Sequence, residues 1–297
     1  MDEAGLQTFV TIARLGRVTP AARELGVSQP TLTRRLQGLE REVGATLLVR
    51  QSSGLRLTSA VERFLEHALR SLDALRAGRD ALAEVAGGLR GVVSIGAIPS
   101  VGTYALPDVV ARFHREHPDV RIALTEALPA ELEASIVSGQ ADLIIVNLPL
   151  RRRELTARTL WREEYVLAVP AEHPLASGIG AVTLDEIGKE PLVAVASSPA
   201  THAVIAAAEA KGIAARLVVS ADNHESVRRM VARGIGVALV PQLMTRVTTP
   251  QVVYREIGRG VPRRQVAVVH RGEATLSGAA RALRDAVVAA FAKRNRK

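Results

Sequence analysis

The residues between Ser28 and Arg41 have the types and the spacing that suit contact with DNA. A helix that begins after Ser28 places apolar side chains on one inward stripe, at three- and four-residue intervals. These apolar residues are Leu32, Leu36, Leu39 and Val43. The other side of the helix presents Thr, Arg and Gln side chains, which hydrogen-bond base edges and phosphates. The residues predicted to contact DNA on this helix are Ser28, Gln29, Pro30, Thr31, Thr33, Arg34 and Gln37.

A second set of polar side chains lies where predicted strands end in the C-terminal part of the chain. Ligands of open α/β sheets bind outside the carboxyl ends of the strands. Free N–H groups at the helix starts that follow favour a carboxylate, a sulfate or a phosphate. The residues predicted to contact a small, anionic ligand are Ser100, Thr103, Asn147, Ser197, Ser198, Thr201 and Asn223. The alternative for Ser100 is that it only caps the helix that follows it.

Other chemistries find no support in the sequence. The seven histidines do not pair with acidic residues at metal-ligand spacing. The chain contains no nucleophile elbow, phosphate-binding loop or paired-carboxylate motif, so we expect no enzymatic activity, no metal and no cofactor. The absence of cysteine excludes disulfides and thiolate sites.

A short helix and a turn must position the DNA-contacting helix. Thr19 is predicted to cap a helix over residues 20–25, with Pro20 at its first position. Gly26 supplies the tight turn, and Ser28 is predicted to cap the second helix. This pattern predicts a helix-turn-helix, although amphipathic helix pairs with a glycine turn also occur in helical proteins that bind no DNA.

Two short apolar segments, residues 47–50 and 55–58, follow this helix pair around a polar Ser/Gly turn. They predict a hairpin, which would form the wing of a winged helix-turn-helix. Arg50 and Arg56 flank its tip and are predicted to reach phosphates or the minor groove beside the helix. The alternative is that both are solvated surface arginines.

Residues 59–86 predict one long helix, capped by Thr58 or Ser59 and about 42 Å in length. Apolar residues repeat along it at heptad spacing, with Arg79 intruding at one position. These seam residues are Val61, Leu65, Ala68, Leu72, Leu75 and Leu82. Such a seam needs a partner, which is either the body of the same protein or the same helix of a second subunit. Glycines at 87, 88 and 91 then predict a short hinge.

Beyond residue 91 the pattern changes to alternating strands and helices. Strands are predicted over residues 92–98, 120–125, 143–146, 166–169, 192–196, 217–220, 237–240 and 264–270. Helices are predicted after the first strand up to about residue 116, and over residues 132–137, 203–211, 225–233 and 277–293. This alternation favours an α/β fold built from βαβ units with mainly parallel sheets.

The N-terminal sequence resembles the LysR-type transcriptional regulators. The resemblance rests on residues 6–10, 21–25 and 27–34, and on Leu39-Glu40 and Val43-Gly44, with the run Val27-Ser28-Gln29-Pro30 as its most specific part. The chain departs from the family pattern at Leu48, where an aromatic residue is usual, at Ala60-Val61, where glycine is usual, and at Arg17-Val18. These are packing positions outside the predicted DNA-contacting face.

The resemblance implies a domain plan for the whole chain. Residues 1–58 would form the winged helix-turn-helix, residues 59–90 a dimerisation linker helix with its hinge, and residues 91–297 an effector-binding domain. That domain would be two-lobed and similar to periplasmic solute-binding proteins, with lobe one at 91–164 and 266–297 and lobe two at 165–265. The effector would bind in the cleft between the lobes.

The resemblance also implies a mechanism and partners. A homodimer, assembling into a dimer of dimers, would bind double-stranded DNA at two half-sites. Binding of a small metabolite would shift the lobes, alter the bend of the DNA and change contact with RNA polymerase. The lack of cysteine excludes peroxide sensing through a thiol, a mode known in this family.

Composition sets further bounds. The 297 residues carry a net charge of +9, which favours anionic partners such as nucleic acid. The chain has no apolar run of membrane-spanning length and no signal peptide, so we expect a cytoplasmic protein without a membrane partner. The alternative function is a solute-binding protein without a DNA-binding role, which would need export.

Overall fold

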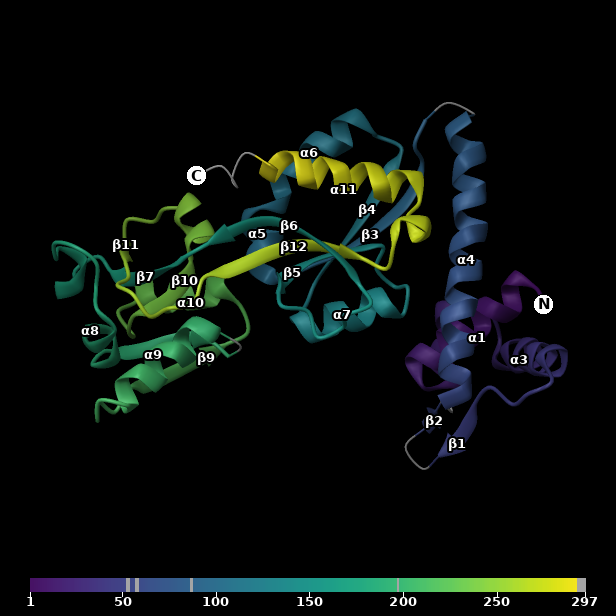
Figure 1. Cartoon of the computed structure of the whole chain (residues 1–297), viewed down its shortest axis with the longest axis horizontal. Helices are drawn as coiled ribbons and strands as arrows, with labels where there is room; N and C mark the ends of the chain where they lie inside the picture. The colour runs from purple at the N-terminus through teal and green to yellow at the C-terminus, as the bar shows by residue number, and fades with distance from the viewer. Residues whose placement is uncertain (52–53, 57–58, 86–87, 197, 293–297) are drawn as a thin grey trace.

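The computed structural model describes residues 1–51, 54–56, 59–85, 88–196 and 198–292. Figure 1 shows an N-terminal module on the right, joined through a long helix to two α/β units, one in the centre and one on the left. Among the described helices, none combines the length and the apolar character that spanning a membrane requires.

The N-terminal module contains α1 (Glu3–Leu15), α2 (Val18–Glu24) and α3 (Gln29–Val43), followed by the hairpin of β1 (Val49–Gln51) and β2 (Gly54–Arg56). Its core is aliphatic and aromatic, with the side chains of Phe9, Ile12 and Leu32 fully buried. The predicted helix-turn-helix and its antiparallel hairpin are therefore both present.

The start of α2 differs from the sequence prediction. The helix begins at Val18 rather than Pro20, and Arg17 precedes it without a side-chain cap. Thr19 is therefore not the N-cap. Its hydroxyl lies in the first turn and accepts a hydrogen bond from Gln29 Nε2 at 2.8 Å, which ties α2 to α3. Pro20 still lies in the first turn, where the missing N–H is harmless.

The start of α3 agrees with the prediction. The Ser28 hydroxyl accepts a hydrogen bond from the Thr31 N–H, and the helix ends at Gly44, whose φ of 70° is left-handed. Leu32 and Leu39 are buried on its inward side, and Leu36 and Val43 pack partly buried against the same core. The inward stripe thus orients the opposite face toward solvent.

The long helix α4 (Ser59–Val85) divides its apolar seam between two surroundings. Val61 and Ala68 are buried in the core of the N-terminal module. Farther along, Leu75 is 45% exposed and Leu82 is 74% exposed. The first half of the seam therefore packs against the protein itself, and the second half faces solvent. Thr58, one of the two predicted caps, lies outside the described residues.

The first α/β unit is built on a five-stranded mixed sheet in the order β4-β3-β5-β12-β6. Its strands are β3 (Gly91–Ala97), β4 (Val120–Glu126), β5 (Leu143–Leu148), β6 (Thr156–Glu163) and β12 (Arg264–His270). Helices α6 (Leu106–Glu116) and α11 (Gly278–Phe291) cover one face, and α7 (Pro129–Val137) covers the other (Figure 1).

The second unit contains two smaller sheets. Strands β10 (Ala238–Pro241), β7 (Tyr165–Pro170) and β11 (Val252–Glu256) are antiparallel, and β8 (Pro191–Val195) pairs in parallel with β9 (Arg216–Ala221). Helices α8 (Leu184–Gly188), α9 (Pro199–Glu209) and α10 (His224–Ala232) pack around them. Short 3-10 turns lie at Pro174–Ala176, Gln242–Arg246 and Glu273–Thr275.

The prediction of mainly parallel sheets was wrong. The chain leaves the first sheet after β6 and returns to it as β12, which runs antiparallel to both of its neighbours. Strand β6 was not predicted because its charged and polar residues, from Thr156 to Glu163, form no apolar run. Strand β11 was also missed. Because the chain leaves the first unit for the second and then returns, the returning strand β12 completes the first sheet in the antiparallel direction.

The helix predicted between the first strand and residue 116 is two helices. A short α5 (Pro99–Tyr104) ends at Ala105, whose φ and ψ of −122° and −40° break the helix. Pro107 follows in the first turn of α6, where its missing N–H prevents the earlier helix from continuing. The break turns α5 out of line with α6, at the edge of the second unit.

Candidate DNA-contact face and ligand cleft

The outward face of α3 is open to solvent. Ser28, Gln29 and Pro30 are exposed at its start, and Thr33, Arg34, Gln37 and Arg41 are exposed along it, whereas Thr31 is half-buried. The Ser28 and Thr31 hydroxyls lie 2.9 Å apart, so the cap holds both side chains at the helix start. Thr33, Arg34, Gln37 and Arg41 therefore form an exposed strip, and the other predicted residues lie at the helix start.

The arginines of this strip are held along the helix by their own backbone. Arg34 Nε donates to the Pro30 carbonyl at 3.4 Å, and Arg41 Nε donates to the Gln37 carbonyl at 3.3 Å. Within the described part of the chain, neither Arg34 nor Arg41 forms an ion pair. Their guanidinium ends are thus available to an external acceptor such as a phosphate or a base edge.

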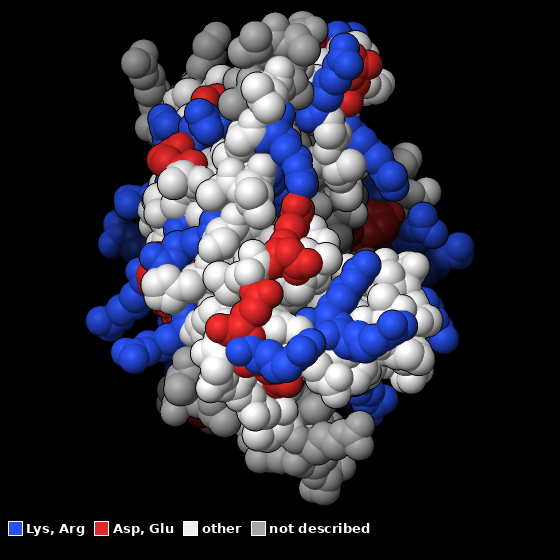
Figure 2. All heavy atoms as spheres, turned by 90° about the vertical axis from the view of Figure 1, so that its right-hand side faces the viewer, with Lys and Arg blue, Asp and Glu red and all other residues white. Residues whose placement is uncertain are grey.

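The surface around this module is mixed in charge. Figure 2 shows Lys and Arg side chains projecting at several places on this side of the molecule, with Asp and Glu side chains between them. The hairpin beyond α3 aligns Arg50 with Leu55 and Val49 with Arg56 across its two strands. The side chains of Arg50 and Arg56 lie outside the described part of the structure.

A cleft of about 520 Å³ lies between the two α/β units. One wall comes from α5 and from the segment that joins β4 to α7, and the opposite wall comes from the segment that joins β9 to α10. The cleft brings together three of the residues predicted to contact a ligand: Ser100, Thr103 and Asn223. Both walls follow the carboxyl ends of strands, as the rule for open α/β sheets requires.

The other predicted ligand residues lie elsewhere. Ser198 caps α9, and its buried hydroxyl accepts hydrogen bonds from the Thr201 N–H and from the Thr201 hydroxyl. Neither residue lines the cleft: Ser198 caps α9, and Thr201 donates to that cap. Asn147 is half-buried on β5, opposite Val266 of β12, and does not line the cleft. Ser197 lies outside the described residues.

A buried ion pair lies behind the cleft residue Ser100, where the chain passes between the units. Arg264 and Glu163 are both almost fully buried, with their nearest charged atoms 2.7 Å apart. Arg264 also donates to the Ser100 hydroxyl at 2.9 Å, and Glu163 accepts from the backbone N–H of Leu243 in the second unit at 2.6 Å. We call Glu163 and Arg264 the hinge pair. It connects a cleft residue, Ser100, to both crossings of the chain.

A second polar contact closes one end of the cleft. The Tyr104 hydroxyl on α5 donates to Glu225 on α10 at 2.9 Å, and so joins the two units. Arg228 and Arg229 also hold the Glu225 carboxylate. These donors, Arg228 first among them, lower the pKa of Glu225 to about 2 despite its partial burial. Burial and the bond to Glu225 raise the pKa of Tyr104, so its hydroxyl remains a donor.

The charge of the cleft is negative. Its described lining includes the carboxyl groups of Glu126, Glu131, Asp222 and Glu225 and contains no Lys or Arg. Burial raises the pKa of Glu126 and lowers the pKa of His224 to about 4, so His224 is neutral at pH 7. A lining of this kind argues against the anionic ligand expected from the sequence.

The sequence reasoning missed these acidic residues, although part of the signal was available. Glu126 directly follows the strand predicted over residues 120–125, so the rule that selected Ser100 also selects Glu126. Asp222 and His224 flank Asn223 in the same segment. Tyr104 and Glu225 are brought together across 121 residues, and no local pattern predicts that contact. In the part of the chain that the structure describes, no cluster of His, Asp and Glu could hold a metal ion.

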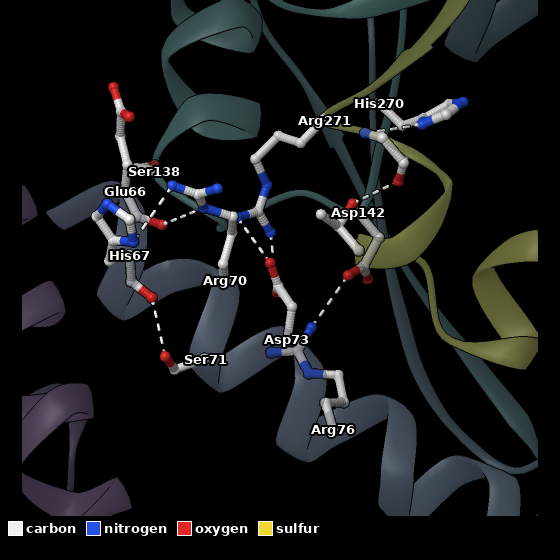
Figure 3. A network of polar contacts seen from close by, with 12 residues as sticks. Glu66, His67, Arg70, Ser71, Asp73, Arg76, Ser138, Asp142, His270 and Arg271 are labelled. Atoms are coloured by element: carbon white, nitrogen blue, oxygen red, sulfur yellow. Dashed lines mark hydrogen bonds and ion pairs between the residues drawn. The ribbon is translucent and has the colours of Figure 1, made fainter. Parts of the chain in front are cut away.

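A polar network joins α4 to the first α/β unit. Asp73 and Arg271 form an ion pair with 2.9 Å between the charged atoms, and both side chains are largely buried. One turn along α4, Arg76 donates to the buried carboxylate of Asp142 at 3.0 Å (Figure 3). The Ser94 N–H supports the same carboxylate at 2.8 Å. We call Asp73, Arg76, Asp142 and Arg271 the linker clasp. It is a direct connection between the linker helix and the unit that carries Ser100.

Two family models match this chain. The model described as "Bacterial regulatory helix-turn-helix protein, lysR family" matches residues 4–62. The model described as "LysR substrate binding domain" matches residues 86–292.

Curated relatives and solved structures match over nearly the full length. The regulator AlsR of Bacillus subtilis is 31% identical over 260 residues, covering 86% of each chain. The Hca operon transcriptional activator HcaR of Escherichia coli is 31% identical over 267 residues, covering 88% of this chain and 89% of its own. The structure of a full-length OxyR variant from Pseudomonas aeruginosa aligns with a TM-score of 0.73 at 25% identity, covering 98% of this chain and 94% of that one.

Proposed function

Because this chain belongs to the LysR family of transcriptional regulators, we propose that it reads double-stranded DNA with the outward face of α3. The chain is a DNA-binding transcriptional regulator with an effector-binding C-terminal domain, and its family is not one of enzymes. Residues 28–37 would supply the contacts to base edges and phosphates, and the wing arginines Arg50 and Arg56 would add contacts beside them.

The single observation that carries this proposal is the state of the α3 face. It is exposed, it carries Thr, Arg and Gln, and Arg34 forms no ion pair with another described residue. The Gln29–Thr19 hydrogen bond and the Ser28 cap fix the helix on its module. A face that is rigid and unpaired suits direct readout in a major groove.

We propose a homodimer, supported by the surface of α4. Leu75 and Leu82 are exposed on the second half of the helix, and neither belongs to an apolar cluster of the described residues. The same half of α4 in a second subunit would cover them, giving a homodimer that spaces two DNA modules. We extend this to a dimer of dimers that contacts RNA polymerase, by analogy with the family plan.

The effector domain would work as a two-lobed switch. We propose a domain division at residues 1–58, 59–90 and 91–297, with the lobes meeting at the hinge pair. A small molecule that binds the cleft contacts both walls, and so favours one relative position of the lobes. The linker clasp would carry that change from lobe one to α4.

The test is footprinting of the purified full-length protein on the DNA upstream of its own gene. We expect protection at two half-sites and an affinity that falls steeply with salt. The Arg34→Ala variant should bind about 10- to 100-fold more weakly, corresponding to about 1–3 kcal/mol for a base contact.

The matched control for this test is Arg115→Ala, at an exposed arginine near the end of α6. It should leave the footprint unchanged. Absence of sequence-specific protection in the wild-type protein would contradict the proposed DNA-binding role.

A further inference from the structure

We infer that the cleft between the lobes binds an organic cation, with an ammonium or guanidinium group on a short aliphatic body. This inference rests on the proposed function, because it names the chemical class of the effector. The site itself is given by the cavity between the lobes of an effector-binding domain. The acidic lining decides only the charge of the molecule that fits.

Both walls of the cleft contribute negative charge. Glu126 and Glu131 come from lobe one, and Asp222 and Glu225 come from lobe two. No Lys or Arg belongs to the described lining, although the whole chain carries a net charge of +9. A concave site lined by one sign of charge concentrates ligands of the opposite sign.

Two of these carboxylates already have partners within the protein. Glu225 is held by Arg228 and Arg229, and Glu131 accepts the Leu128 N–H at the start of α7. Among the described residues, Glu126 and Asp222 form neither an ion pair nor a side-chain hydrogen bond. The two unpaired carboxylates lie on opposite walls, so a cation between them would be held from both sides.

Glu126 is kept in the cleft by the shape of α5. A Cβ atom added at Gly102 would lie 2.1 Å from Glu126 Oε1, so the carboxylate rests directly against the backbone of the short helix. Partial burial there raises the pKa of Glu126, although the residue as a whole is exposed. A cationic group in contact with this carboxylate would replace the lost hydration.

The lining favours an organic cation over a metal ion. The described residues contain no group of three acids and histidines close enough to ligate a metal. The remaining lining is apolar or hydroxylic, with Pro99, Ala127 and Leu128 beside Thr103. A volume of about 520 Å³ fits a small molecule with an apolar body and one or two charged ends.

The experiment is calorimetric titration of the full-length protein with probes of four-carbon length. The cations are butylamine, 1,4-diaminobutane and 4-guanidinobutylamine, and the matched anions are butanoate and succinate. We expect at least one cation to bind and neither anion to do so. Glu126→Gln and Asp222→Asn should each weaken cation binding at least tenfold. The control Glu116→Gln, at an exposed acid at the end of α6, should leave it unchanged.

The outcomes separate this inference from the proposed function. Binding of succinate, lost in Ser100→Ala and without binding of any cation, overturns the cationic class and keeps the cleft as the effector site. Binding of none of the five probes also overturns it. Cation binding that is unchanged in both Glu126→Gln and Asp222→Asn contradicts the assigned site. A missing DNA footprint instead contradicts the proposed function, and leaves the titration results interpretable.

Discussion

The hinge pair and the linker clasp are both built from arginine and carboxylate, but they differ in how far water reaches them. At the hinge, the side chains of Arg264 and Glu163 are 5% and 7% exposed. In the clasp, the buried Asp142 meets an Arg76 side chain that is 52% exposed. The Arg264–Glu163 pair is therefore shielded from water on both sides, whereas the Arg76–Asp142 pair is shielded on one side only.

This difference has an energetic consequence. Removing one member of a buried ion pair leaves an uncompensated charge, whereas an exposed pair contributes little. The hinge pair has further hydrogen bonds: Arg264 donates to Ser100, and Glu163 accepts from Trp161 and from the Leu243 N–H. The hinge is thus a permanent part of the fold, and the outer part of the clasp is a contact that a small free-energy change can release.

The largest predicted effect is at the hinge. Arg264→Ala should lower the free energy of unfolding by about 3–5 kcal/mol, because it leaves Glu163 buried and unpaired. Chemical denaturation measures this loss. The neighbouring pair Arg263–Glu164 is the matched control, since both side chains are exposed, and Arg263→Ala should change stability by less than about 1 kcal/mol. Equal losses in the two variants would remove the distinction between buried and exposed pairs.

The second-largest predicted effect is a dependence of the free energy of unfolding on pH, caused by His224 near the hinge pair. The pKa of His224 is lowered from 6.5 to about 4, mainly by burial and further by Arg264. Below pH 6.5 His224 becomes protonated in the unfolded chain but stays neutral in the folded chain until the pH approaches 4. The free energy of unfolding therefore falls as the pH falls toward 4. The contribution of His224 to this loss should reach about 3 kcal/mol.

Unfolding curves of the wild type and of His224→Gln between pH 7 and pH 4 isolate this contribution. The variant should lose less stability over that range than the wild type. Parallel curves would show that His224 is not buried in its neutral form.

The third-largest effect on stability is expected at the ion pair Asp73–Arg271, the more buried part of the linker clasp. Arg271→Ala should destabilise the protein by about 2 kcal/mol, between the limits for fully buried and exposed pairs, because the Asp73 carboxylate loses its counter-charge. The charge swap Asp73→Arg with Arg271→Asp should recover part of the loss. Denaturation of both variants tests whether the pair itself is responsible, and a swap that is as unstable as the two single changes combined would argue against it.

The smallest effect is expected at Arg76. Arg76→Ala should cost less than about 1 kcal/mol, because the exposed side of the pair is solvated and the Ser94 N–H still supports Asp142. Its consequence should appear in the response of the footprint to the effector instead. A loss as large as that of Arg264→Ala would show that the two junctions are equally rigid.

Local features of this fold were predictable, and features that depend on distant contacts were not. The Ser28 cap and the stripe with Leu32 and Leu39 follow from neighbouring residues, and the structure confirms both. Thr19 was misplaced because its hydroxyl bonds Gln29 on the next helix instead of its own backbone. The mixed sheets depend on β12 returning from the second unit, which no strand pattern indicates.

In the cleft, too, the residues placed by local sequence could be predicted, whereas the contacts between distant residues could not. Ser100, Thr103 and Asn223 were found by their positions after strands, and the structure places them in one lining. The contacts that define the two junctions join residues 101 and 198 positions apart, for Arg264 with Glu163 and Arg271 with Asp73. Sequence spacing carries no information at that range, because it depends on how two separate sheets are assembled.

Because the clasp lies near the middle of α4, a small tilt of the helix at the clasp moves the end of the helix by a larger distance. Asp73 and Arg76 lie near its middle, about 25 Å from the end that enters the wing at Ser59. A tilt of about 10° at the clasp would displace that end by about 4 Å, a distance comparable to the rise of one base pair. In the proposed switch, a small displacement at the clasp is therefore enlarged along α4 into a movement of the DNA-contacting module.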